Sequence, residues 1–130
     1  DGQKQDDEIH LITSGTLKNT PEGYLLCYDE SLDEEAPPQQ VALLLEDGGV
    51  MMRRGGPYET QMVFRKAQRY QGVYRTPYGD MEMAVYATRV HYRVDESGGD
   101  VALQYQLDLA GQFAAMHDMT LQFIRKRGEA

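Results

Sequence analysis

Two residues stand where an inward-facing side chain could do chemistry, and the first is His117. It lies in the segment from Phe113 to Phe123. Apart from His117 itself, every second residue of this segment, counted from Phe113, is apolar. Alternate residues of a strand share a face, so His117 would face the core. Such a histidine is more often a hydrogen-bonded core residue than a ligand, and no other histidine or carboxylate stands at metal-ligand spacing to it. A weaker hypothesis makes it the acid or base of a hydrolase or isomerase, with a neighbouring carboxylate.

The second residue, Arg54, is the stronger candidate for binding. It shares its phase with Val50 and Met52, on the apolar side of a short segment. A buried guanidinium needs a partner, and its planar fork fits a carboxylate or a phosphate. We therefore expect either an anionic group of a ligand beside Arg54 or neutralisation by Glu82 or Asp108. The alternative is that the strand ends at Arg54 and leaves it in water at a rim.

Tyrosine supplies most of the aromatic content, with nine tyrosines and no tryptophan. Its ring is apolar and its hydroxyl is polar, which suits the wall of a pocket. Tyr70 and Tyr74 share one phase, and Tyr105 is in phase with its apolar neighbours. We expect these three to line a ligand-binding site together with Arg54 and His117. Ordinary packing in strands is the alternative use of the tyrosines.

Other signatures of chemistry are missing from the sequence. None of the serines stands in a nucleophile-elbow pattern, and the glycines between Arg54 and Pro57 fit a hairpin turn better than a phosphate-binding loop. Cys27, the single cysteine, lies in the middle of a predicted strand, where it would act as a small hydrophobe. We expect no catalytic residues, no metal and no cofactor, and therefore a non-enzymatic protein.

The elements that must position these residues are strands. Short alternating segments are separated by turn residues, with nine strand candidates and almost no helical periodicity. Asp47-Gly48-Gly49 is a hairpin signal, and in Gly72–Met83 the residues Pro77 and Gly79 suit the second and last positions of a type I turn. We predict an all-β fold, a closed antiparallel up-and-down β-barrel of about eight to ten strands, because closure removes the exposed edges of a long meander.

One predicted strand, from Asp80 to Val94, is too long to be regular. Its apolar residues change phase half-way along, from Met81, Met83 and Val85 to Val90, Tyr92 and Val94. Such a switch indicates a bulge or a sharp bend.

The net charge of −8 is unevenly distributed. Residues 1–35 hold ten acidic residues against Lys4 and Lys18, whereas acids and bases balance in residues 36–130. An acidic surface repels phosphate backbones, so we expect no nucleic-acid partner. No apolar run approaches the roughly 20 residues of a membrane helix, so we expect no membrane partner either.

The length of 130 residues favours one domain. We expect a single β-barrel over residues 9–126, a disordered or tag-derived segment over residues 1–8, and a polar tail over residues 127–130. A single cysteine permits no intrachain disulfide, which fits a reducing compartment, and we expect a cytoplasmic protein. A leader removed before Asp1 would leave no trace. The oligomeric state does not follow from the sequence.

Five segments of the chain, in one order, carry a family resemblance. They are Thr13–Leu17, Gly23–Glu30, Met52–Gly56, Gly72–Gly79 and Gly98–Leu107. Together they resemble the YwiB-like proteins of Gram-positive bacteria, an uncharacterised family. The resemblance implies a lipocalin-like, or calycin, β-barrel. It implies no established activity and brings no catalytic residues with it.

The pattern leads to two functional hypotheses. The first is a binding barrel for a small, partly apolar ligand, with an anionic group near Arg54 and the tyrosines. The second is a structural or protein-interaction module whose barrel is packed solid and whose acidic loop, Asp29–Glu35, meets a basic partner. A small barrel has room for side chains or for one small ligand. A cavity that opens to solvent would favour the first hypothesis, and a filled interior the second.

Overall fold

The computed structural model describes residues 13–31, 38–56 and 59–126. Within these residues the chain forms nine β-strands in two antiparallel sheets, so the all-β prediction is confirmed. The described part contains no helix long and apolar enough to cross a membrane. The terminal segments predicted over residues 1–8 and 127–130 lie outside the described residues.

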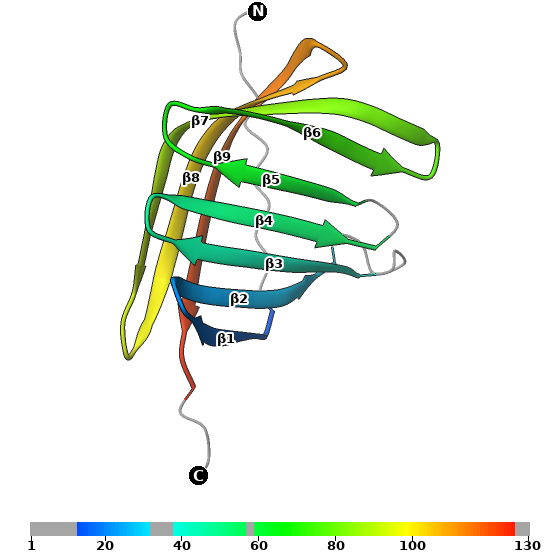
Figure 1. Ribbon diagram of the computed structural model, residues 1–130. Helices are drawn as coiled ribbons and strands as arrows, with labels where there is room; N and C mark the ends of the chain where they lie inside the picture. The colour runs from blue at the N-terminus through cyan, green and yellow to red at the C-terminus, as the bar shows by residue number, and fades with distance from the viewer. Residues whose placement is uncertain (1–12, 32–37, 57–58, 127–130) are drawn as a thin grey trace, which may run out of the picture.

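The two sheets are consecutive meanders with strands of different length. The first sheet contains β1 (Gly15–Thr20), β2 (Gly23–Glu30), β3 (Gln39–Glu46), β4 (Gly49–Gly55) and β5 (Thr60–Phe64), in that order. The second contains β6 (Arg69–Thr76), β7 (Gly79–Val94), β8 (Gly98–Leu109) and β9 (Gln112–Ile124), again in chain order. In Figure 1 the strands β2–β5 cross in front of β7, β8 and β9, which run steeply behind them. The sheets therefore pack face to face with crossed strands.

The closed barrel that the sequence predicts is not formed. Within the described residues, backbone hydrogen bonds join the two sheets at two places: Glu59 and Arg75 exchange two bonds of 2.9 Å, and the Ala67 amide donates to the Ala87 carbonyl over 2.8 Å. On the opposite side, β1 and β9 are the outer strands of their sheets and are not paired with each other in the described part. The strands are too unequal for one even ladder, since β5 has 5 residues and β7 has 16.

Strand alternation sends apolar side chains of both sheets into one core. The most completely buried ones are Val41, Leu43, Leu45, Val50, Met52 and Phe64 in the first sheet and Val85, Ala87, Val101 and Leu103 in the second. Between the sheets, the Thr60 hydroxyl donates to Met83 Sδ over 3.4 Å. The core therefore lies between the sheets and is built from the phases that the sequence indicates.

The phase switch in β7 is a β-bulge, as predicted. Ala87 pairs with Tyr105, and Arg89 pairs with the preceding residue Gln104, so Thr88 is an extra residue. The Thr88 hydroxyl lies 3.2 Å from the Gln104 carbonyl oxygen and bonds the bulge to β8. Apolar residues before and after the bulge can therefore face the same core.

A second bulge, between β8 and β9, has no counterpart in the sequence-based prediction. Leu107 pairs with Ala115, whereas Asp108 pairs with Phe113, so Ala114 is an extra residue. Phe113 consequently leaves the inward phase of β9 and is 62% exposed. The expectation that Phe113 faces the core is wrong, because apolar alternation alone does not show an inserted residue next to a turn.

The hairpin between β6 and β7 lies where the sequence predicts it. Thr76 Oγ1 donates to the Gly79 carbonyl over 2.7 Å and accepts from the Tyr78 amide over 3.1 Å. Gly79 has a φ of +129°, which favours glycine. Side-chain hydrogen bonding and backbone conformation thus both stabilise this turn, and with it the register of β6 against β7.

Candidate functional site

Arg54 lies on the inner face of the first sheet, where apolar rows give way to polar side chains. Its cross-strand row consists of Gly15, Tyr28, Val41, Arg54 and Thr60, paired in turn from β1 to β5. The next inner row is entirely apolar and consists of Leu17, Leu26, Leu43, Met52 and Met62. The guanidinium therefore stands at the border of the packed core.

Glu30, the last residue of β2, is the ionic partner of Arg54. Arg54 Nε donates to Oε1 of Glu30 over 3.2 Å, and Nη2 donates to Oε2 over 3.4 Å. The two side chains meet across β3, and Val41 of that strand is only 1% exposed. They are themselves largely buried, with 24% of the Arg54 side chain and 13% of the Glu30 side chain exposed. The arrangement is a forked ion pair shielded from much of the solvent.

The acidic residues that the sequence analysis names as partners of Arg54 lie elsewhere. Asp108 is paired with Arg69, with Oδ2 3.4 Å from Nη1. Glu82 is exposed and precedes the buried Met83, so it points to the outer face of the second sheet. The prediction of these partners is therefore wrong. Arg54 does not stand in water at a rim either, since most of its side chain is covered.

Tyr105 and His117 form the opposite wall of the site. They pair across β8 and β9, and their rings stack with centroids 5.2 Å apart and an interplanar angle of 29°. On its other side, Tyr105 contacts Phe64 of the first sheet at a centroid distance of 4.8 Å. Tyr105 is 5% exposed, whereas His117 is exposed although it faces inward. The inner face of β9 is therefore accessible to solvent at His117.

The pKa values of three groups near the ion pair are shifted in the direction that favours their neutral forms. Partial burial lowers the pKa of His117, and the nearby Arg54 lowers it further. Burial raises the pKa of Tyr28, helped by Glu30 and opposed by Arg54. Burial likewise raises the pKa of Tyr105, opposed by Arg54 and helped by Glu30. Two phenols and an imidazole thus surround one compensated pair of charges.

Three of the five predicted site residues are brought together, and two lie at the edge of the second sheet. Arg54 is close enough to Tyr105 and His117 to influence the pKa of both. Tyr70 and Tyr74 belong to β6 and are partly buried against the core. The Tyr70 ring covers Gly72, where an added Cβ would lie 2.9 Å from it. Participation of all five in ligand binding stays a prediction.

Tyr28 and Glu30 are also part of this site, although neither is among the site residues predicted from the sequence. Both share the phase of Leu26 on β2, so alternation is the signal that could have found them. The acidic composition predicts a loop at Glu30, whereas β2 continues through this residue and pairs it with Gln39. The acidic residues around Glu30 indicate an exposed loop, so the sequence does not show that its carboxylate faces inward.

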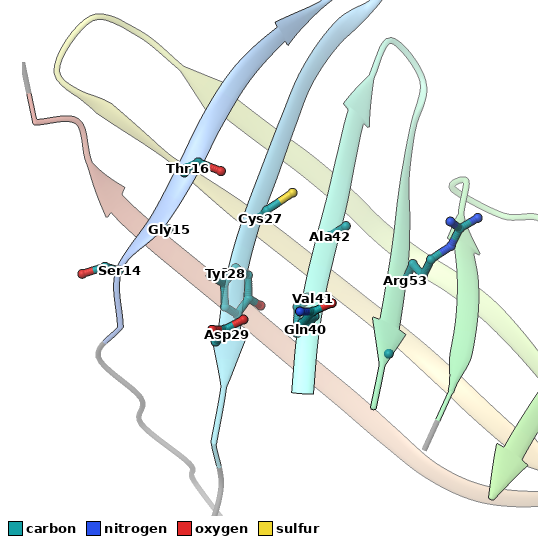
Figure 2. A pocket seen from close by; sticks show the side chains of 11 residues that line it. Ser14, Gly15, Thr16, Cys27, Tyr28, Asp29, Gln40, Val41, Ala42 and Arg53 are labelled. Atoms are coloured by element: carbon teal, nitrogen blue, oxygen red, sulfur yellow. The ribbon is translucent and has the colours of Figure 1, made fainter. Parts of the chain in front are cut away.

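A groove of about 410 Å³ lies on the outer face of the first sheet (Figure 2). An outward-facing row crosses its floor and consists of Thr16, Cys27, Ala42 and Arg53. Arg53 Nη2 donates to Gln61 Oε1 over 3.1 Å, which holds the guanidinium toward β5. The small side chains of β2 and β3 make this groove, and its lining also includes Gly15, Tyr28 and Val41 from the row of Arg54.

The described residues contain no group of three or more His, Cys, Asp or Glu side chains that could hold a metal ion. His91 lies 4.0 Å from Asp100 in an exposed position. The ring neighbour of His117 is Tyr105, and within residues 13–31, 38–56 and 59–126 no carboxylate forms an ion pair with it. The acid–base hypothesis for His117 therefore gains no partner from this part of the chain.

Comparison with known proteins places the chain in a family. The model of DUF1934, a domain of unknown function, matches residues 1–121. The chain belongs to the DUF1934 family. The crystal structure of the YwiB protein from Bacillus subtilis is similar over 83% of this chain and 72% of that one, with a TM-score of 0.71 and 18% identity. This likeness concerns the fold and confirms the YwiB-like resemblance, while no curated protein matches the chain.

Membership in DUF1934 assigns no activity to the chain. A function for this member therefore has to be argued from its own side chains, and the border between core and solvent at Arg54 is where charged, aromatic and apolar groups meet.

Proposed function

We propose that this protein is a non-enzymatic binding protein for a small, partly apolar ligand. The ligand lies between the two sheets, with its polar end at Arg54, Tyr28 and Tyr105. We interpret the fold as a lipocalin-like barrel opened along one side, in a cytoplasmic bacterial protein. Barrels of this size accept one small ligand among their inner side chains.

The observation that carries this proposal is the inward-facing but exposed His117. Its ladder partner Tyr105 is buried, so the packed core ends between these two residues. The ion pair of Arg54 and Glu30 lies at the same border. An apolar wall with a few polar groups at its mouth is the usual composition of a small-molecule site.

The first test is native mass spectrometry of the protein purified from its own host, where we expect a bound small molecule. The second is calorimetric titration with octanamide, a soluble probe with an apolar tail and a polar head. We expect Arg54→Met to weaken octanamide binding by roughly 1.5–3 kcal/mol, the range for a hydrogen bond to a charged group. Arg53→Met is the matched control, because Arg53 faces the outer groove. Equal effects of the two variants would contradict an inner site.

A second candidate function is a packed structural or protein-interaction module. It is favoured by the filled core, in which Leu43, Leu45, Met52 and Phe64 have no exposed surface. Its expected partner surface, the acidic loop Asp29–Glu35, falls largely on residues 32–37, which the structure does not describe. A ligand-free protein from the host and no binding of octanamide would favour this candidate.

A further inference from the structure

We propose that the polar end of the ligand is an uncharged group that both donates and accepts hydrogen bonds, such as a carboxamide, because Glu30 already neutralises Arg54. This inference rests on the proposed function of the inner site. It departs from the anionic group that Arg54 suggests in the sequence, and it names a class of ligand in its place.

The geometry of the ion pair is the first argument. Both carboxylate oxygens of Glu30 accept from Arg54, at 3.2 and 3.4 Å, so the fork that would recognise a ligand carboxylate is occupied. Glu30 is the less exposed partner, with 13% of its side chain accessible. A ligand anion would have to lie beside this carboxylate in a partly desolvated site, where like charges repel strongly.

The remaining groups are the second argument. The hydroxyls of Tyr28 and Tyr105 both donate and accept, and a neutral imidazole does the same through its two nitrogens. The pKa directions of all three groups agree with neutral side chains near pH 7. Arg54 keeps further N–H donors beyond the two that Glu30 uses. Such a set matches a head group with one acceptor and one donor, and it offers an anion no net positive charge.

The experiment compares two probes with the same tail, octanamide and octanoate, by calorimetric titration of the full chain at pH 7.5. We expect the wild type to bind octanamide at least about tenfold more tightly than octanoate, a ratio that corresponds to about 1.4 kcal/mol. Octanoate binding equal to or tighter than octanamide binding would overturn the inference and leave the proposed function standing. Binding of neither probe would overturn both.

The second readout is a reversal of the preference between octanamide and octanoate in a variant. Glu30→Gln frees the Arg54 fork, so we expect this variant to prefer octanoate. Asp29→Asn is the matched control, since it removes the neighbouring carboxylate, which is exposed and lines the outer groove. It should leave the octanamide preference unchanged. An unchanged preference in a folded Glu30→Gln protein would contradict the inference, and the wild-type comparison decides it if that variant does not fold.

Discussion

The imidazole of His117 stacks on the phenol ring of Tyr105, with ring centroids 5.2 Å apart. The other neighbour of Tyr105 is Phe64, at 4.8 Å in the opposite sheet. One buried ring therefore joins the packed core to the proposed binding site. Changes at this position should affect stability and binding together, whereas changes at His117 should affect mainly binding.

Tyr105→Ala should lower the free energy of unfolding by about 3–5 kcal/mol, the range for removing a buried aromatic side chain. Tyr105→Phe keeps the ring and both ring contacts, so its loss should be much smaller. Urea unfolding of the two variants provides the comparison. Equal losses would mean that the hydroxyl, and not ring packing, holds the two sheets together here.

His117 should become protonated at a lower pH than an ordinary histidine, because its pKa is lowered. Burial and Arg54 both lower its pKa from 6.5, so the folded state takes up a proton less readily than the unfolded state. Stability should therefore decrease as the pH falls from about 6.5 toward the lowered pKa. Proton NMR of the imidazole measures the pKa directly. Arg54→Met should raise it only part of the way to 6.5, because burial, the larger cause, remains.

The turn at Asp95 should make the protein sensitive to strong acid. The hydroxyl and the amide of Ser97 donate to Asp95 Oδ1 over 2.7 and 2.8 Å, the Gly98 amide does so over 3.1 Å, and Arg93 forms an ion pair with the carboxylate. These contacts lower the pKa of Asp95 from 3.8 to about 2. The unfolded state binds more protons in this interval, so the stability that Asp95 contributes is lost as the pH falls from 3.8 toward 2.

Thermal melts between pH 2 and neutral pH test this linkage. Asp95→Ala should lower the Tm at neutral pH and flatten its decrease in acid. Glu96→Gln is the control, since it alters an exposed carboxylate of the same turn. If the Tm of both variants decreases with falling pH as much as that of the wild type, then Asp95 does not contribute to acid sensitivity.

Pro77→Ala should cost about 0.4–1 kcal/mol of stability, because proline restricts the unfolded chain and presets the turn after Thr76. Octanamide affinity should stay unchanged in this variant. Urea melts and titrations of the same preparation measure both quantities. Loss of binding by a folded Pro77→Ala protein would make the β6–β7 turn part of a site.

Deletion of Thr88 should prevent native folding, because it removes the extra residue of the β7 bulge and reverses the faces of Val90, Tyr92 and Val94. Thr88→Ala keeps the extra residue and loses only the hydroxyl contacts with the carbonyl oxygen and Oε1 of Gln104, at a cost of about 1 kcal/mol. Circular dichroism and urea unfolding separate the two cases. A deletion variant as stable as Thr88→Ala would show that β7 tolerates either register.

Local patterns of the sequence were sufficient for the strands and for the first bulge. The phase switch between Val85 and Val90 carries enough apolar residues on each side to reveal an insertion. In β9 only one apolar residue, Phe113, precedes Ala114, so there is no apolar phase before the bulge to compare with the phase after it. Local patterns also could not predict whether the barrel closes, because closure depends on how unequal strands of two sheets meet and not on any one strand.

The candidate site was predictable in part for a similar reason. Alternation placed Arg54, Tyr105 and His117 on inner faces, and the structure brings them together from both sheets. It could not identify Glu30 as the partner, because that contact crosses β3 between residues 24 positions apart. Pairing across an intervening strand depends on register, which the acidic composition after Tyr28 did not reveal.

The hydrogen bonds at Glu59–Arg75 and Ala67–Ala87 all lie on the side of the molecule where β5 meets β6 and β7. On that side the backbones of the two sheets are joined, whereas β1 and β9 are not paired with each other in the described residues. The separation of β1 and β9 therefore depends on side-chain packing and not on a shared hydrogen-bond ladder. A ligand that enters between these two strands would break no backbone hydrogen bond between them, so its entry would cost only the side-chain contacts that it displaces.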